Sequence, residues 1–291
     1  MPWGLYSIVL PEVHHPLYST HLKMIRAYES LKTLQQVTQG FLEGNPYAVH
    51  RQFDPDSREH FITASVDQRA PVEDWSVHIG EAVHNMRSSL DHLAWQLTIS
   101  ASGDPPDPLP KDWRRIEFPI FSTQAGWDGK VGWKRKIWGV SPQNRARIER
   151  LQPFCCGEAT ATRHPLWVLH ELDNVDKHRS LNIVGAAMSV SHLEFVGLGS
   201  GHVELRHQST GPFQDGAEMA RFLIPPEFHT QVEVNDRYRF DVAFDKGPPA
   251  YGGRVIATLT AIYAMVGCTL RAFLDEWPHR VPPTSFAFEN R

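Results

Sequence analysis

The chain has 291 residues, of which 41% are apolar and 21% charged, and its formal net charge is −4. This composition is typical of a globular protein, and it excludes a disordered chain and a uniformly basic nucleic-acid coat protein. Three cysteines, two of them adjacent, do not resemble a disulfide framework and favour a reducing cytoplasm. Because the amino terminus lacks a basic signal region and the uncharged stretch 255–270 is short for a membrane span, we expect no membrane association.

The first part of the chain predicts a helix followed by a hairpin. Apolar residues recur at three- and four-residue spacing over 17–41, which indicates an amphipathic helix ending near Gly40. Residues 47–53 and 60–66 then flank the sequence Asp-Pro-Asp-Ser, whose turn chemistry predicts a β-hairpin.

The middle of the chain is mainly helical. Residues 79–97 carry a continuous apolar stripe and predict a long helix capped by Asp74 or Ser76. Residues 102–113 contain four prolines and predict a loop, and residues 116–121 predict a short strand. Further helices are expected over 141–151 and 165–181.

The last third changes to period-two patterns over 182–244, which predict an antiparallel sheet, and then to a helix over 254–277. We therefore expect an α+β fold in which a helical bundle carries an inserted or appended antiparallel sheet. The expected division is a mainly helical domain over 1–181 with a hairpin near 47–66, a sheet region over 182–246, and a region over 247–291 whose long helix packs back on the bundle before a tail.

Two helices have an unusual density of polar side chains. On the helix 79–97, Glu81, Asn85, Ser88 and His92 form one polar stripe, which His84, Arg87 and Asp91 flank. The second helix, 165–181, carries the polar residues His170, Glu171, Asp173, Asn174, Asp176, Lys177, His178 and Arg179. Since a helix dipole disfavours acids near the C-terminus, we expect the two helices to pair, for instance Asp173 or Asp176 with Arg87 or His92. Solvated polar faces are the alternative interpretation.

The segment Arg87-Ser88-Ser89-Leu90-Asp91-His92 resembles the arginine and histidine motif of HEPN-type ribonucleases, although that family often has Asn, Asp or His where Ser88 stands. The resemblance implies a dimeric helical bundle that cleaves RNA with no metal and no cofactor. His92 would transfer the proton and Arg87 would stabilise the phosphorane, with His84, Asp91, Asp176 and His178 in support. The segments HNMRSSLDH and NVDKHR also resemble bacterial proteins of similar size, over residues 15–180, which implies a shared architecture but no activity.

A basic segment favours RNA as the partner. Residues 127–150 interleave cations with tryptophans, which could neutralise phosphates and stack on bases. The predicted RNA-binding residues are Lys130, Trp133, Lys134, Arg135, Lys136, Arg145 and Arg147. The alternative is that the tryptophans, Trp127 and Trp138 included, anchor the loop to the core while the charges are solvated.

Two other functions fit the same residues. One is a non-enzymatic dimeric interaction module, in which the polar helices form the dimer contact. The other is a helical-bundle metalloenzyme, because Glu81-x-x-His84 has the spacing of a di-iron ligand pair, with Glu29, Glu171 and His178 as further ligands. A second Glu-x-x-His is missing. The ribonuclease hypothesis requires Arg87, His92 and His178 to converge in one cleft near residues 127–150.

Overall fold

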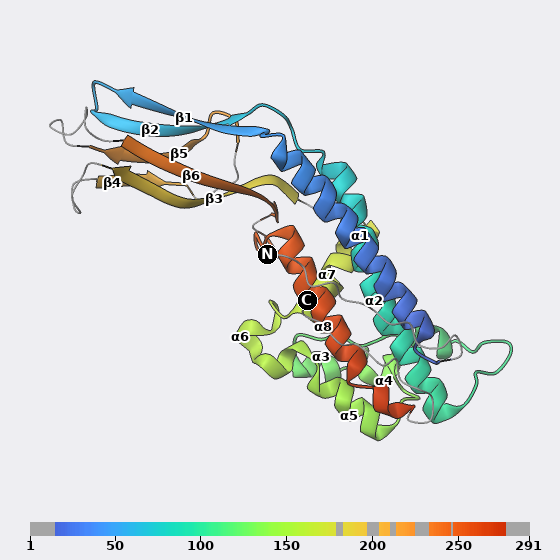
Figure 1. The fold of residues 1–291 in the computed structure, drawn as a ribbon. Coiled ribbons are helices and arrows are strands. Elements are labelled where there is room, and N and C mark those ends of the chain that lie inside the picture. Colours follow the sequence, from blue (N-terminus) through green and yellow to red (C-terminus); the bar gives the residue numbers. More distant parts are fainter. Residues whose placement is uncertain are drawn as a thin grey trace.

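In the computed structural model, antiparallel strands extend from one end of a helical body (Figure 1). The structure describes residues 15–178, 183–196, 204–209, 214–224, 233–245 and 247–277. This arrangement confirms the α+β class. Arg179, the expected helix end at residue 181 and the tail over 278–291 lie outside the described residues.

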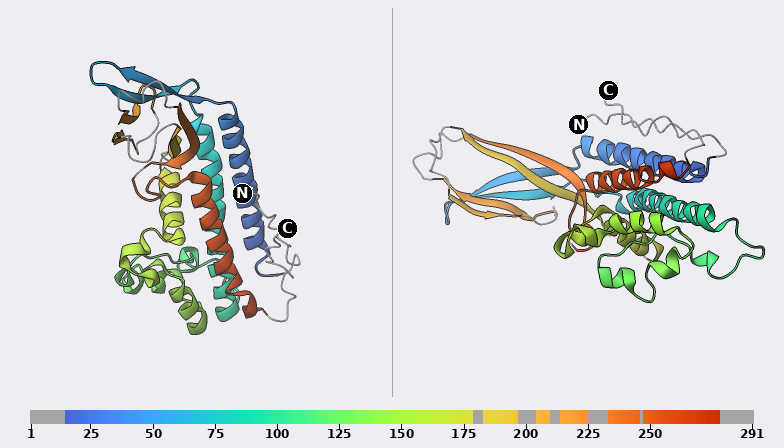
Figure 2. Two further views of the ribbon diagram at one scale, coloured as in Figure 1. Left: turned by 60° about the vertical axis from the view of Figure 1, so that its left-hand side comes forward. Right: turned by 90° about the horizontal axis from the view of Figure 1, so that it is seen from below.

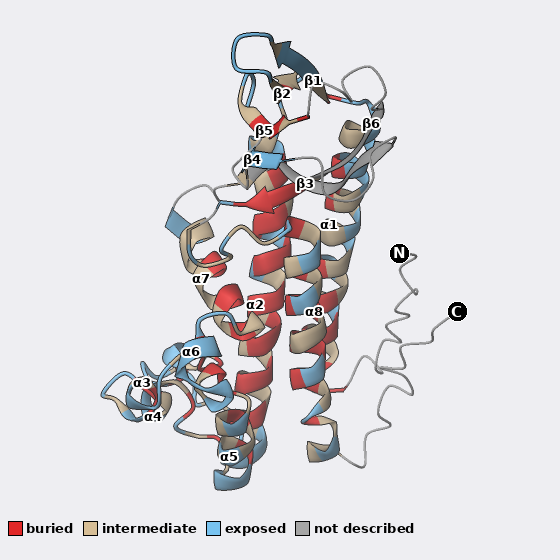
Figure 3. Ribbon diagram, turned by 90° about the vertical axis from the view of Figure 1, so that its left-hand side faces the viewer, coloured by how far each residue is buried: buried red, intermediate tan, exposed pale blue. Residues whose placement is uncertain are grey.

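Four long helices build the body: α1 (Tyr18–Glu43), α2 (Val72–Ser102), α7 (Pro165–His178) and α8 (Val255–Arg271). Figure 2 shows α1, α2 and α8 running alongside one another. The central helix is α2, which is buried along most of its length (Figure 3). The predicted apolar stripe is confirmed, because its members are all fully buried: Ile79, Val83, Met86, Leu90, Leu93 and Leu97. Each such side chain contributes about 1.5–3 kcal/mol by leaving water.

The helix boundaries differ from the predicted ones. The helix α1 continues past Gly40 to Glu43, and α2 begins at Val72, directly after Pro71. No side chain caps α2. Ser76 instead lies in its second turn and donates a hydrogen bond from Oγ to the Val72 carbonyl at 2.7 Å, while exposed Asp74 lies in the first turn, where a negative charge favours the helix dipole. The predicted cap was therefore wrong.

Short helical elements connect α2 to α7. They are η1 (Trp113–Arg115), α3 (Gln124–Asp128), α4 (Trp133–Lys136), α5 (Pro142–Arg150), η2 (Pro153–Cys156) and α6 (Glu158–Ala161). Ser141 caps α5 by accepting a hydrogen bond from the Asn144 N–H at 3.3 Å. At its other end, Arg147 forms a bidentate ion pair with Asp275 of η4 (Leu274–Glu276), at 2.8 and 2.7 Å. This pair joins the connecting region to the end of the α8 segment.

The strand predicted over 116–121 is not formed, because side chains and the Lys136 carbonyl of α4, rather than another strand, satisfy this backbone. The Phe118 N–H donates a hydrogen bond to Asp91, and the Phe118 carbonyl accepts one from Arg87. Gln152 bonds to the Pro119 carbonyl at 2.9 Å and to the Phe121 N–H at 3.0 Å. Since proline has no N–H to donate to a ladder, the segment lies extended against the helices.

The predicted hairpin is confirmed as β1 (Tyr47–Asp54) and β2 (Glu59–Val66). It belongs to a four-stranded sheet of order β1-β2-β5-β4, with β5 at Glu218–Leu223 and β4 at Glu204–Gln208. The strands β3 (Ile183–Val196) and β6 (Glu233–Phe244) form a separate antiparallel pair. The predicted hairpin thus joins a strand of the region 182–246 in one sheet, because β2 pairs with β5, which lies far away in the sequence.

One helix among the described residues, Val255–Glu276, is long and apolar enough by composition to cross a membrane. In the structure, Leu259, Ile262, Val266 and Leu270 of this helix are buried in the bundle. This is the packing of a core helix, as expected for residues 255–270.

Candidate anion-binding site

The polar residues of α2 divide into two groups with different neighbours. The predicted stripe lies along α1: Ser30 Oγ donates to Glu81 Oε2 at 3.3 Å, and Ser19 Oγ lies 3.1 Å from His92 Nδ1. Burial lowers the pKa of His92, and the positive charge of Lys23 lowers it further. Its position between α1 and α2 therefore favours the neutral form of His92.

The second group, which includes Arg87 and Asp91, lies along the segment 116–121 on another side of α2. Arg87 is buried, with 4% of its surface exposed. Its Nη2 atom donates to the Phe118 carbonyl at 2.8 Å, and lies 3.0 Å from Asp91 Oδ1 and 3.6 Å from Glu117 Oε2. Asp91 Oδ1 in turn accepts the Phe118 N–H at 2.9 Å. Arg87 and Asp91, an i, i+4 pair on α2, thus hold the extended segment 116–121 against this helix.

Arg87 and His92 do not converge. Five residues apart on a helix, they point about 140° from each other at 100° per residue, and they contact different elements. His178 is the exposed last residue of α7. The structure gives these three residues no shared contact among the residues that it describes, and Arg87 acts as a positioning residue for the backbone around Phe118.

The helices α2 and α7 do meet through polar side chains, but not through the predicted pairs. The side chain of Asp173 is only 3% exposed, and it pairs with Lys177 at 2.5 Å and with His84 Nδ1 at 3.9 Å. The carboxylate of Asp176 lies directly against Gly80, where it would clash with an added Cβ. The α2 residue that pairs with an acid of α7 is thus His84 rather than Arg87 or His92.

The charge of Arg87 acts on His170, a residue of α7 outside the predicted site. Burial, together with the positive charges of Arg87 and Lys136, lowers the pKa of His170 to about 4. Asn174 Nδ2 donates to His170 Nε2 at 3.3 Å. The i, i+4 spacing of these two residues was the signal in the sequence, but the helical pattern alone does not show which element faces them.

A polar cavity of about 500 Å³ opens beside this cluster. Its charged lining consists of four cations and two carboxylates, contributed by α2, the segment 114–117 and α4: Arg114, Arg115, Arg135, Lys136, Asp91 and Glu117. We call this cavity the basic pocket. Ile116 and exposed Val131 complete its lining. Arg114 and Arg115 were missed in the sequence because they follow the proline-rich loop; the adjacent arginines after Trp113 were the available signal.

Both carboxylates of the basic pocket are engaged within the protein. Burial raises the pKa of Asp91, with Arg87 and the Phe118 N–H acting in the opposite direction. Burial also disfavours ionisation of Glu117, but its hydrogen bond with Lys136 and the charges of Lys136 and Arg87 outweigh this effect and lower its pKa. Arg115 forms an ion pair with Asp112, with 3.4 Å between Nη1 and Oδ1. Arg114 and Arg135, in contrast, form no ion pair with any residue that the structure describes.

The other predicted RNA-binding residues lie outside this lining. Arg145 stacks over the Trp133 ring at 4.3 Å, and Lys134 lies 5.7 Å from the same ring. Arg147 is held by Asp275, and Lys130 is exposed. Only Arg135 and Lys136 among the seven predicted residues line the pocket.

The tryptophans of this region have different roles. Trp127 is 1% exposed and belongs to the core, which is the anchoring role weighed in the sequence. Trp138 is 41% exposed, packs edge-on against Trp113, and donates a hydrogen bond to the Asp112 carbonyl at 3.4 Å. An accessible indole therefore stands beside the residues that lead into Arg114 and Arg115.

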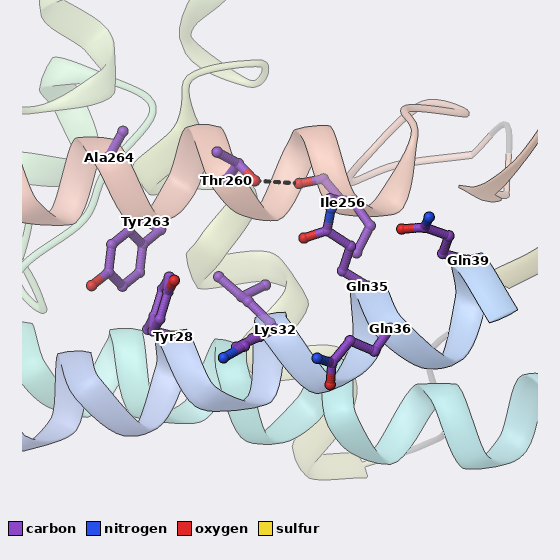
Figure 4. Close-up of a pocket in the computed structure, with 10 residues that line it drawn as sticks. Tyr28, Lys32, Gln35, Gln36, Gln39, Ile256, Thr260, Tyr263 and Ala264 are labelled. Carbon is purple, nitrogen blue, oxygen red and sulfur yellow. Dashed lines mark hydrogen bonds between the residues drawn. The ribbon is translucent and has the colours of Figure 1, made fainter. Parts of the chain in front are cut away.

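A second cavity, of about 320 Å³, lies between α1 and α8 (Figure 4). Tyr28 and Tyr263 approach each other there, with ring centroids 6.2 Å apart, and the lining also includes three glutamines, Thr260 and the apolar residues Leu31, Ile256 and Ala264. Lys32 is its single charged residue, so this cavity is a poor site for a polyanion.

Within the part of the chain that the structure describes, no group of three or more histidine, cysteine, aspartate or glutamate side chains is arranged to hold a metal ion. The suggested ligand pair is divided, since Glu81 contacts Ser30 of α1 while His84 contacts Asp173 of α7. Comparison with protein-family models, curated proteins and solved structures finds no match to this chain. The function therefore has to be argued from the basic pocket itself.

Proposed function

We propose that the protein binds single-stranded RNA by placing phosphate groups in the basic pocket. The observation that carries this proposal is the composition of the lining, in which four cations surround two carboxylates that already have partners inside the protein. Two positive charges are thus uncompensated. Arginine suits such a site because its planar guanidinium binds phosphate through two hydrogen bonds.

The surroundings of the pocket favour RNA over a small inorganic anion. Trp138 presents an exposed indole and Val131 an exposed apolar side chain in the same region. Recognition of unpaired bases uses stacking on aromatic rings, which contributes about 1–3 kcal/mol per base, together with cations that follow the backbone. An arginine-lined cavity beside an accessible tryptophan supplies both elements.

The geometry supports binding better than cleavage by Arg87 and His92. A proton-transfer residue must come within hydrogen-bond distance of the proton that it moves. His92 instead contacts Ser19 on the α1 side, and Arg87 is buried and engaged by the Phe118 carbonyl, Asp91 and Glu117. The resemblance to HEPN-type ribonucleases is thus retained here for RNA as the ligand, and not for the roles of these two residues.

The proposal is tested by the affinity of a fluorescein-labelled, mixed-sequence single-stranded RNA, measured by fluorescence anisotropy at several salt concentrations. The test variant is R114Q/R135Q, which removes the two unpaired cations of the pocket. The control is K32Q/R69Q, which removes the same charge from positions on α1 and before α2, away from the pocket. We expect the test variant to bind RNA at least tenfold more weakly. The slope of log affinity against log salt concentration should fall in magnitude by about 1.4, because each of the two lost phosphate contacts contributes about 0.7. Equal losses in the two variants, or no binding by the wild type, would overturn the proposal.

A further inference from the structure

Glu117 occupies the basic pocket with a carboxylate of the protein itself. It forms a hydrogen bond with Lys136, and its Oε2 atom lies 3.6 Å from Arg87 Nη2. The backbone of the two elements is also joined, because the Glu117 N–H donates to the Lys136 carbonyl at 3.3 Å. Its side chain nevertheless remains 44% exposed, so a ligand can reach it.

A ligand phosphate has to compete with this internal carboxylate. Glu117 is already positioned beside Lys136, so it loses little freedom by staying there, whereas an incoming group loses translational and rotational freedom. An internal phosphodiester carries one negative charge, as Glu117 does, and the carboxylate of Asp91 opposes any phosphate that enters the pocket. Exchange of one monoanion for another therefore gains little at Lys136.

A phosphate monoester changes this balance. It carries a charge of about −1.5 to −2 at pH 7 and three terminal oxygens, and it can neutralise the two positive charges that the lining leaves uncompensated. Arg114 and Arg135 can bind two of its oxygens, while the third reaches the ammonium group of Lys136, which has three donors and can keep Glu117 as well. The dianion thus gains interactions that a diester cannot make.

From this we infer, resting on the proposed function, that the basic pocket selects the terminal phosphate monoester of an RNA strand through Arg114 and Arg135, and that Glu117 lowers the affinity of the pocket for every phosphate. The carboxylate opposes a terminal dianion at least as strongly as an internal phosphodiester, so the preference for the dianion comes from the two unpaired cations, Arg114 and Arg135. A 5′ phosphate and a 3′ phosphate share the chemistry that the pocket recognises.

The test compares RNAs of one sequence that carry a 5′ phosphate, a 3′ phosphate or no terminal phosphate, each with an internal fluorophore. We expect at least one monoester form to bind the wild type at least tenfold more tightly than the unphosphorylated strand, and the two monoester arms identify the preferred end. E117Q should bind every strand several-fold more tightly than the wild type and keep the preference for the monoester, whereas R114Q/R135Q should lower that preference below threefold. E158Q, which removes an exposed carboxylate of α6 and changes the net charge equally, should behave as the wild type.

A second measurement needs no variant and therefore does not depend on the folding of E117Q. An RNA with a 5′ methyl phosphate has the size of the monoester but a single negative charge, and the wild type should bind it as weakly as the unphosphorylated strand if the 5′ end is preferred; a 3′ methyl phosphate serves for the other end. Equal binding of all forms by the wild type would overturn the selectivity while leaving RNA binding intact. An unchanged affinity of folded E117Q for every strand would overturn the role of Glu117, and failure of every RNA to bind would remove the proposed function.

Discussion

Substitution of Arg87 by methionine should destabilise the protein while preserving most of the buried apolar volume. The change leaves the Phe118 carbonyl without its side-chain donor and removes the cation beside Asp91 and Glu117. Breaking a buried ion pair from one side costs about 3–5 kcal/mol. Because the Asp91 and Glu117 side chains are 32% and 44% exposed and recover some hydration, we expect R87M to cost about 2–3 kcal/mol.

The cost is measured by urea unfolding at pH 7, followed by tryptophan fluorescence and circular dichroism. The double variant R87M/D91N tests the reason for the cost, since an asparagine in place of Asp91 keeps an acceptor for the Phe118 N–H and removes the charge that Arg87 balances. It should be more stable than R87M by about 1 kcal/mol, and R87K should lie between R87M and the wild type because lysine cannot reproduce the fork geometry. A loss below about 0.5 kcal/mol for R87M, or additive losses in the double variant, would refute the reasoning.

Three further outcomes follow from individual residues. Because burial holds the His170 pKa near 4 against about 6.5 in the unfolded chain, the folded state loses stability as the pH falls from 6.5 to 4, by roughly 3 kcal/mol at most. H170Q should remove this part of the loss in urea titrations at pH 7 and pH 4.5, and parallel losses in both proteins would count against it. H92A should change RNA affinity by less than about twofold in the anisotropy assay, because His92 lies on the α1 side of α2. A tenfold loss of affinity would show that His92 takes part in RNA binding. G132A would drive a Cβ into the backbone carbonyl of Trp127 and should lower the free energy of unfolding by about 1–3 kcal/mol or more. G40A, whose added Cβ meets nothing within 4 Å, should stabilise α1 by about 0.5–1 kcal/mol in thermal unfolding. Similar effects of the two substitutions would contradict this packing.

The sequence predicted the elements that depend on local periodicity. The stripe from Ile79 to Leu97 repeats every three or four residues along α2, so the central helix could be recognised before its partners were known. The hairpin was recognisable because an Asp-Pro turn separates two segments of strand-forming residues. Its partner was not, because the pairing of β2 with β5 joins segments far apart in the chain and no local pattern specifies that register.

The same distinction applies to the site. The high density of polar residues on α2 and α7 could be recognised in the sequence. A helical wheel, however, cannot show that His92 faces α1 while Arg87 faces Phe118. Arg87 and Asp91 looked like reactive groups, whereas in the structure they satisfy backbone groups of a segment that has no strand partner. Half of the pocket's cations came from the predicted basic segment, and the other half came from Arg114 and Arg115, which the proline-rich loop brings back to α2.

The central claim, that RNA enters the basic pocket, is tested most directly by mapping where RNA touches the protein. A single-stranded RNA containing 4-thiouridine is crosslinked to the wild-type protein by long-wavelength ultraviolet light, and the attached peptides are identified by mass spectrometry. We predict crosslinks within residues 113–138, at Trp138 above all, and their loss in R114Q/R135Q. Crosslinks confined to the strands or to the cavity between α1 and α8, unchanged in that variant, would contradict the account.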